Sequence, residues 1–198
     1  MLGRQKKQAA PPRGGRHESD ELGLIGRVAA GDRADFETLY RLYFPRLTRF
    51  LDRMTHNAAM IEEIVNDTMM VVWRRAATFD GTCKLSTWIF SIAYRTALKA
   101  INHRDAPVDD DPDLRHGDQA WEPDAQLGRQ QLQQRIGVAL DAIPVEQSTV
   151  VNLAYYHGMA YEEIGQIMDC PVNTVKTRMF HARRRLKILL ADQSESTS

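Results

Sequence analysis

The sequence of 198 residues contains no long run of apolar residues. A membrane-spanning helix needs about 18 or more consecutive apolar residues, and no stretch of this chain approaches that length. With 43% hydrophobic and 26% charged residues, the composition is typical of one or two small globular domains. We therefore expect a cytoplasmic protein without membrane insertion.

Cysteine is scarce as well, because Cys83 and Cys170 are the only two in the chain. They are far apart in sequence, and neither belongs to a C-x-x-C pair. No cluster of Cys and His supplies the four closely spaced ligands that a zinc site needs. We expect two reduced thiols, no metal and no cofactor, while a redox role for either thiol stays open.

The first residues lack the features of a secretory signal. The stretch from Met1 to Arg16 is basic, but no apolar run follows it, as it would in a signal peptide. We expect a disordered basic tail over residues 1–20 and a short disordered tail over residues 192–198.

Charge is balanced overall but unevenly distributed. Residues 172–191 contain no acidic side chain, whereas residues 105–124 contain many aspartates and only Arg115 as a basic residue. Segregated charge predicts different partners for different segments. The acidic segment also holds Pro107 and Pro112 and few apolar residues, so it cannot bury enough surface to offset the entropy of ordering. We predict a flexible linker over residues 105–122.

Helical periodicity dominates the remainder of the chain. Apolar residues recur at steps of three and four over residues 36–54, which predicts a helix that starts at Asp32 or Asp35 and is kinked at Pro45. Similar patterns predict helices over residues 21–30, 59–75, 86–102, 126–140, 144–158, 161–168 and 172–190. No segment alternates with period two. The predicted fold class is all-α, with two small helical domains (21–104 and 123–191) joined by the acidic linker.

Residues 161–190 have the layout of a helix-turn-helix motif. In the last helix Val175, Met179, Ala182, Leu186 and Leu189 form an apolar stripe that faces the core. The opposite face carries short polar groups and cations, which suit base edges and phosphates respectively. A solvated basic helix without a ligand is the simpler alternative, but the turn and the absence of acids favour DNA binding.

Four segments carry a resemblance to a known family. They read FETLYRLYFPRLTRFL, EEIVNDTMMVVWRRA, TFDGTCKLSTWIFSIAYRTALKAINHR and YEEIGQIMDCPVNTVKTRMFHARRRLK. In order and spacing they resemble segments of the extracytoplasmic-function sigma factors, the compact members of the bacterial sigma-70 family. The resemblance covers residues 21–102 and 126–190. It implies a transcription initiation factor that binds core RNA polymerase, reads the −10 and −35 promoter elements, and is controlled by an anti-sigma factor.

The resemblance also implies roles for individual residues. Glu63, Asn66 and Asp67 would meet the clamp helices of the largest polymerase subunit, although the family often has Gln where Asn66 stands. The loop at residues 79–85, with Lys84, would capture an extruded base of the −10 element. Further −10 candidates are Ser91, Arg95, Lys99, Asn102 and Arg104.

The second domain would sit on the flap of the other large subunit and read the −35 element. Its candidate DNA-binding residues are Asn173, Thr174, Lys176, Thr177, Arg178, Phe180, His181 and Arg184. Housekeeping members of the family carry two adjacent aromatic residues where Ser91 and Ile92 stand here. The resemblance therefore implies that strand opening depends on a well-matched promoter.

Two alternatives remain at the level of sequence. A freestanding helix-turn-helix regulator would bind duplex DNA alone, but it leaves the first domain unexplained. An enzyme is the other alternative, yet His56, His157 and the linker aspartates form no nucleophile–base or metal-ligand pattern. We expect no enzymatic activity. Target promoters, the anti-sigma factor and the orientation of the domains do not follow from the sequence.

Overall fold

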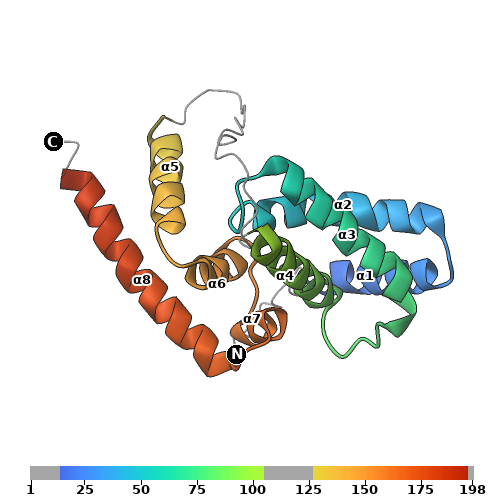
Figure 1. Cartoon of the computed structure of the whole chain (residues 1–198). Coiled ribbons are helices and arrows are strands. Elements are labelled where there is room, and N and C mark those ends of the chain that lie inside the picture. Colours follow the sequence, from blue (N-terminus) through green and yellow to red (C-terminus); the bar gives the residue numbers. More distant parts are fainter. Residues whose placement is uncertain (1–13, 105–126, 196–198) are drawn as a thin grey trace, which may run out of the picture.

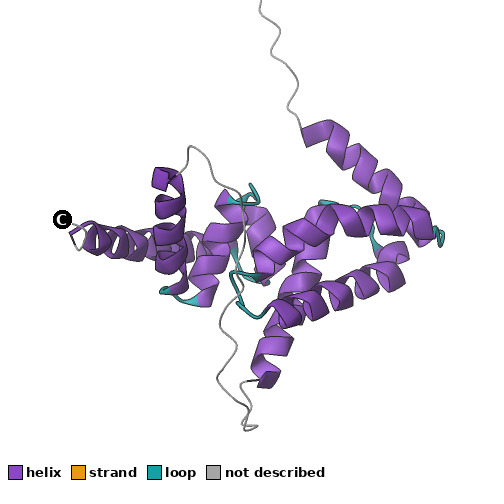
Figure 2. Cartoon of the chain, turned by 90° about the horizontal axis from the view of Figure 1, so that it is seen from above, coloured by secondary structure: helices purple, strands orange, loops and turns teal. Residues whose placement is uncertain are grey.

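A computed structural model describes residues 14–104 and 127–195 of the chain, with side chains over residues 19–103 and 134–191. The described residues form helices and loops without any strand (Figure 2). This confirms the predicted all-α class. The predicted linker at 105–122 lies outside the described residues, as do residues 1–13 and 196–198 of the predicted tails.

The first half contains α1 to α4 and one 3-10 turn. Their bounds are α1 Gly14–Ala29, α2 Arg33–Leu51, α3 Ala58–Arg75, η1 Ala76–Thr78 and α4 Leu85–Arg104. Helix α1 begins earlier than predicted, so part of the expected basic tail is helical. Helix α2 continues through Pro45.

Polar side chains fix where α2 and α3 begin. The carboxylate of Asp32 accepts hydrogen bonds from the backbone N–H groups of Ala34 and Asp35, as predicted for a helix start. The side chain of Asn57 accepts from the N–H of Met60 and caps α3 in the same way. These caps satisfy donors that have no partner within the helix.

The second half contains α5 to α8. Their bounds are α5 Leu127–Asp141, α6 Val145–Tyr155, α7 Tyr161–Met168 and α8 Val172–Glu195. The two helices of the predicted helix-turn-helix therefore begin where the sequence indicated. Ala160 lacks a capping side chain, but the Glu163 carboxylate accepts the N–H of Ala160 at 2.8 Å, which is the glutamate half of a capping box.

Helices α2, α3 and α4 enclose the core of the first half, and α1 packs against α2 (Figure 1). Phe50 and Phe90 are fully buried, with ring centroids 5.2 Å apart. Tyr43 is also fully buried and donates a hydrogen bond to Glu21 of α1 at 2.9 Å. Burial and the nearby carboxylate raise the pKa of Tyr43, so the phenol stays protonated and ties α1 to α2.

The two halves pack against each other, chiefly through α4 and α7, which lie next to one another in Figure 1. The side-chain amide of Asn152 on α6 is 1% exposed and donates to the carbonyl of Phe50 at 3.2 Å. The ring of His157 lies 4.8 Å from that of Phe90 and 6.1 Å from that of Phe50. The expected two domains therefore share one continuous apolar cluster, a contact that the sequence did not predict.

Polar contacts complete this interdomain interface at two separated places. Asp141 of α5 lies 3.5 Å from Arg53 Nη1 and 3.4 Å from His56 Nε2, in the α2–α3 connection. Glu163 of α7 lies 3.2 Å from Lys84 Nζ and accepts a hydrogen bond from Thr87 at 3.2 Å. The two halves are thus held in one orientation by specific polar contacts around an apolar centre.

The position of His157 predicts a pH dependence of stability. Burial, with Arg46 and Arg49 nearby, lowers the pKa of His157 from 6.5 to about 4. The folded state therefore favours the neutral ring. The free energy of unfolding is highest above pH 6.5, where His157 is neutral in both states, and it decreases as the pH falls from 6.5 toward 4. Urea unfolding at pH 7 and pH 5 should show a loss of about 1 kcal/mol that His157→Gln lacks, since water screens part of the penalty. An equal loss in both proteins would contradict this assignment.

Candidate nucleic-acid interface

The helix-turn-helix depends on a sharp turn between α7 and α8. Asp169 adopts a left-handed backbone conformation with φ of 50° and ends α7. The N–H of Cys170 then bonds to the carbonyl of Gly165 at 3.0 Å. A Cβ atom at Gly165 would lie 2.9 Å from the Cys170 carbonyl oxygen, so only glycine allows the chain to turn this closely. The turn sets the angle at which α8 leaves the domain.

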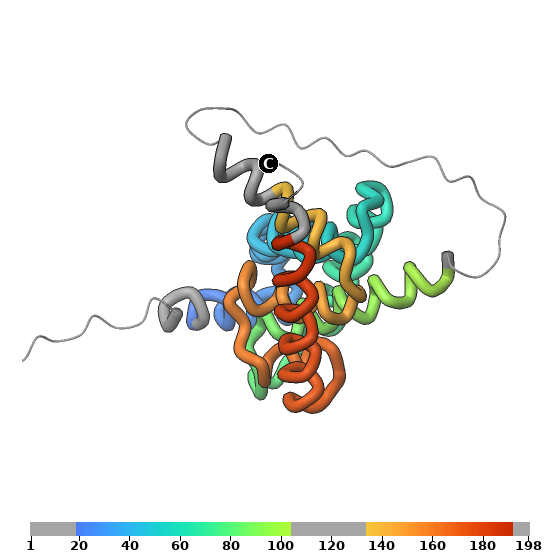
Figure 3. The backbone as a smooth tube through the Cα atoms, turned by 90° about the vertical axis from the view of Figure 1, so that its left-hand side faces the viewer, coloured from blue at the N-terminus to red at the C-terminus, as the bar shows by residue number. Residues whose placement is uncertain are grey.

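Helix α8 buries one face and presents the other to solvent. Val175, Met179 and Ala182 are buried, as the apolar stripe predicted. The opposite side is the α8 outer face, and its exposed members are Asn173, Lys176, Thr177, Phe180, His181 and Arg184. Figure 3 shows α8, in red, on the side of the molecule that faces the viewer. Thr174 is half-buried at the edge of this face.

Phe180 is the large apolar member of the α8 outer face. Its side chain is 63% exposed and meets the ring of His181 edge-on at 5.5 Å. An exposed aromatic ring is costly to hydrate and suits contact with a thymine methyl group or a base edge. The cations around it suit phosphates.

Arg178 departs from the predicted DNA-binding set. It is half-buried, and its Nη1 donates to the Cys170 thiol at 3.6 Å. Burial raises the pKa of Tyr94 on α4, and the charge of Arg178 opposes that rise. Arg178 therefore lies on the flank of α8 next to the α7–α8 turn, within electrostatic range of Tyr94 and away from the α8 outer face.

The sequence missed one pair beside that face. The Tyr155 hydroxyl on α6 accepts a hydrogen bond from Arg183 at 2.7 Å, and the guanidinium also lies 5.8 Å from the Tyr155 ring centroid. Tyr155 is 63% exposed. The pair holds one cation of α8 in place, and because it joins two helices no local pattern could indicate it.

On the first half, Ser91 does not belong to an exposed stripe. It is 7% exposed, donates to the carbonyl of Trp88 at 2.7 Å and accepts from Arg95 Nη2 at 3.1 Å. The hydroxyl is thus occupied by its own helix. Arg95, Lys99 and Asn102 are exposed along α4, as expected, while the side chain of Arg104 lies outside the described residues.

The segment from Phe79 to Lys84, named here the reading loop, is held by local hydrogen bonds. Asp80 accepts from the N–H and the hydroxyl of Thr82, at 3.0 and 2.8 Å. These bonds lower the pKa of Asp80, and Gly81 supplies a positive φ of 72°. The loop is therefore shaped before any ligand arrives.

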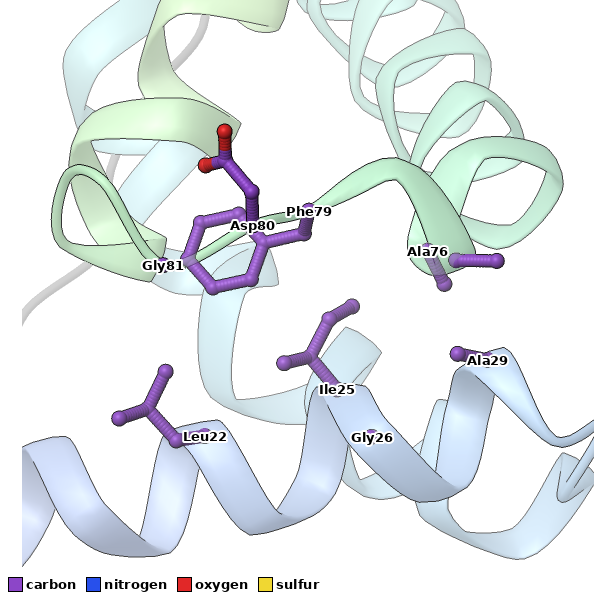
Figure 4. Close-up of a pocket in the computed structure, with 9 residues that line it drawn as sticks. Leu22, Ile25, Gly26, Ala29, Ala76, Phe79, Asp80 and Gly81 are labelled. Atoms are coloured by element: carbon purple, nitrogen blue, oxygen red, sulfur yellow. The ribbon is translucent and has the colours of Figure 1, made fainter.

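A shallow pocket of about 290 Å³ lies between the reading loop and α1 (Figure 4). Leu22 and Ile25 of α1 form one wall, while Phe79, Asp80 and Gly81 form the other. The lining is mostly apolar with one carboxylate. Such a surface can accommodate a flat, partly polar group.

The predicted polymerase-binding residues are all exposed on α3. Glu63, Asn66 and Asp67 lie on its outer side, and Asn66 accepts a hydrogen bond from the Tyr40 hydroxyl at 2.8 Å. Met70, one turn further, is 47% exposed. The exposed methionine suits a protein partner, and the two carboxylates favour one that carries basic groups.

Over residues 14–104 and 127–195 no helix is long and apolar enough to cross a membrane. In the same part of the chain, no group of three or more His, Cys, Asp or Glu side chains is arranged to hold a metal ion.

Two family profiles match the chain in order. Sigma-70 region 2 matches residues 39–106, and Sigma-70 region 4 matches residues 133–186. Together they span more than half of the sequence. The first contains α3, the reading loop and α4, and the second contains the helix-turn-helix.

Named proteins of known function are similar over most of the chain. The RNA polymerase sigma-H factor of Pseudomonas aeruginosa is 27% identical over 173 residues, which cover 82% of this chain and 90% of the relative. The ECF RNA polymerase sigma-E factor of Escherichia coli K12 is 28% identical, with the same coverage of both chains.

Solved structures show the same fold. The sigma factor RpoE of Bartonella quintana, crystallised with the anti-sigma factor NepR, superposes with a TM-score of 0.65 and is 29% identical. The match covers 79% of this chain and 97% of that one. CnrH, solved with the cytosolic domain of CnrY, has a TM-score of 0.64 at 19% identity, covering 86% and 97% of the two chains, which supports the fold alone.

The close approach at Gly165 predicts a loss of stability on substitution. Gly165→Ala places a methyl group against the Cys170 carbonyl, and the forced shift of the turn should cost about 1–3 kcal/mol, measured by urea unfolding. Gly26→Ala on α1 is the matched control, because no atom lies within 4 Å of its added Cβ and alanine favours a helix by up to about 1 kcal/mol. Equal stability of the two variants would contradict the role given to Gly165.

Proposed function

Because the chain belongs to the extracytoplasmic-function group of the sigma-70 family, we propose how its surfaces divide the work of promoter recognition. The protein is an RNA polymerase sigma factor. The match to region 2 excludes a freestanding helix-turn-helix regulator. The observation that carries the assignment is the ordered match of both regions to two halves that each expose a suitable surface.

We assign residues 21–104 to region 2 and residues 123–191 to region 4, joined by the acidic linker at 105–122. The separation of the two profile matches supports this division. The protein acts in the cytoplasm, where its polymerase is, and performs no catalysis of its own. An anti-sigma factor controls it, which the complex of the similar Bartonella sigma factor with an anti-sigma factor supports.

Core polymerase binds the outer side of α3. Glu63 and Asp67 supply negative charge, and Asn66 is held by Tyr40 in a fixed orientation. These groups are positioned to meet basic and polar side chains of the clamp helices in the largest subunit. Region 4 contacts the flap of the other large subunit.

The −10 element is read by the reading loop and α4. Contacts to an extruded base must offset the few kcal/mol of stacking that extrusion loses. The pocket between the loop and α1 supplies apolar walls for such a base, and Lys84, at the end of the loop, supplies a cation for a phosphate of the same strand. Arg95, Lys99 and Asn102 continue this surface along α4.

The −35 element is read by the α8 outer face. Asn173, Thr177 and Phe180 are the candidates for contacts to base edges. Lys176 and Arg184 are long cationic side chains that can extend to phosphates or base edges. No acidic side chain opposes them between residues 172 and 191, so phosphates can approach the whole length of the helix.

Polymerase docking predicts the first functional test. Glu63→Lys with Asp67→Lys reverses two charges on an exposed face, so the fold should persist while affinity for core polymerase falls at least tenfold. The measurement is a titration of labelled protein with core enzyme, followed by in vitro transcription from a promoter library. Wild-type protein should start transcripts at defined promoters.

The control for docking is Glu37→Lys with Glu62→Lys, which changes the same net charge at exposed positions outside the assigned set. Unchanged core affinity of the Glu63/Asp67 variant would refute the docking assignment. A wild-type protein that neither binds core enzyme nor starts transcripts would refute the function itself.

The α8 outer face predicts the second functional test. Arg184→Ala or Lys176→Ala should weaken binding to a duplex −35 element by about 1–3 kcal/mol if a base contact is lost. Arg185→Ala, an exposed cation on the flank of the same helix, should cost less and act equally on all sequences. If Arg185 matters more than Arg184 in a fluorescence-anisotropy titration, the recognition face has been misplaced.

A further inference from the structure

Tyr155 of α6 and Arg183 of α8 lie together on the surface of the second half. The hydroxyl of Tyr155 accepts a hydrogen bond from Arg183 Nη2 at 2.7 Å, and the guanidinium carbon lies 5.8 Å from the centroid of the Tyr155 ring. Tyr155 is 63% exposed, and Arg183 is exposed as well. Contacts between exposed side chains contribute little to stability, so folding alone does not explain why these two groups are held together.

The pair presents unused hydrogen-bond donors to solvent. In the bond to Arg183 the Tyr155 oxygen is the acceptor, so the hydroxyl hydrogen can point elsewhere. The guanidinium is always charged and carries several N–H groups, of which this bond occupies only one. A phenol O–H and a guanidinium held side by side suit an anion that accepts hydrogen bonds from both.

Tyr155 also restricts the direction of the guanidinium. An arginine side chain is long and flexible, and ordering it on binding costs free energy. Here the hydroxyl bond and the ring contact order Arg183 before any ligand arrives. Because α6 packs against α8, the tyrosine approaches the arginine from a neighbouring helix and not from the flexible end of a loop.

The pair continues a basic row along α8. Lys176, Phe180, Arg183 and Lys187 follow one another at steps of four, three and four, so they share one side of the helix, and all of them are exposed. The first two belong to the α8 outer face. Residues 172–191 contain no acidic side chain, so no acid of α8 neutralises this row. Such a row favours a polyanion as the partner.

Arg183 lies at the edge of the α8 outer face, on the side toward α6. A helix with its side chains is about 10–12 Å across, and the major groove of DNA is about 12 Å wide. A recognition helix therefore fills the groove, and its edges meet the phosphates that border it. Tyr155, on the neighbouring helix, would then lie beside the groove, where the DNA backbone passes.

Building on the proposed function, we propose that Tyr155 and Arg183 form one phosphate site, which binds the DNA backbone at the rim of the −35 element. The Tyr155 hydroxyl and an N–H of Arg183 donate to oxygens of the same phosphate. The site carries no sequence information of its own. It fixes how deeply α8 enters the groove, and it thereby places Asn173 and Thr177 at the base edges. Half of the site comes from α6, outside the helix-turn-helix.

The first test removes one hydroxyl group without changing any charge. The full chain is titrated by fluorescence anisotropy against a labelled duplex that carries a −35 element selected from the promoter library, and against a scrambled duplex. Tyr155→Phe should weaken binding to both by about threefold, because a phosphate contact is independent of sequence. Tyr156→Phe is the matched control, since Tyr156 is the neighbouring residue and is 47% exposed, and it should change neither affinity.

The second test removes the cation and then identifies the phosphate. Arg183→Ala should weaken binding by about tenfold and reduce the slope of log affinity against log salt by about one. In the −35 duplex, one phosphate at a time is then replaced by an uncharged methylphosphonate. At one position this change should weaken binding of wild-type protein and of Tyr156→Phe by about tenfold. The double variant of Tyr155→Phe with Arg183→Ala should lose less than about twofold there, because it has already lost both contacts.

Three results would overturn the phosphate site. The first is a Tyr155→Phe variant that binds DNA as tightly as wild-type protein. The second is a double variant that keeps the wild-type sensitivity at every methylphosphonate, since the pair would then act on the fold alone. The third is unchanged DNA affinity together with weaker binding to core polymerase, which would assign the pair to a protein interface.

The proposed function fails in a different way. A wild-type protein that binds the −35 duplex and the scrambled duplex equally well would contradict the reading of the −35 element by α8. The phosphate site would still be supported in that case by equal losses of Tyr155→Phe on both duplexes, and overturned by the absence of any loss.

Discussion

Helix α4 packs against the other helices of the first half on one side and against α7 of the second half on the other. This double contact sets how the two halves are arranged. Ile89, Phe90 and Ala93 are buried within the first half, where Phe90 also meets His157 of the second half. Thr87 donates a hydrogen bond to Glu163 of α7, and the buried Tyr94 lies within electrostatic range of Arg178 on α8. Helix α4 thus joins the two halves, while Arg95, Lys99 and Asn102, the residues proposed to read the −10 element, stay exposed along it.

The polar groups at the interface make it specific rather than strong. Asn152 is buried and donates to a carbonyl of α2, but its own side-chain oxygen has no partner among the described residues. The ion pairs at the edges are partly exposed, where such pairs contribute little to stability. An interface built in this way fixes one orientation and still opens at moderate cost. That is the balance a chain needs if polymerase binding is to separate its halves.

The sequence predicted the helices, the helix-turn-helix and the buried face of α8 because these depend on local periodicity and on capping residues such as Asp32. Contacts between distant helices leave no such pattern. Three such contacts were therefore not predicted: Tyr155 with Arg183, Glu163 with Lys84, and the approach of Arg178 to Tyr94. Ser91 was predicted on an exposed polar stripe because it lies on the polar side of the helical wheel. In the structure its hydroxyl bonds within α4, and the residue is 7% exposed. The residue roles proposed for DNA and polymerase rest on the family resemblance and stay predictions.

The distance between the two halves, measured with and without polymerase, is the most direct test of how they are arranged. Fluorophores introduced at Arg74 on α3 and Lys187 on α8, both exposed, would report it by single-molecule energy transfer in the full chain. We expect one high-transfer population for the free protein and a low-transfer population once core enzyme is bound. A free protein that already shows low transfer, or a transfer efficiency that core enzyme leaves unchanged, would contradict it.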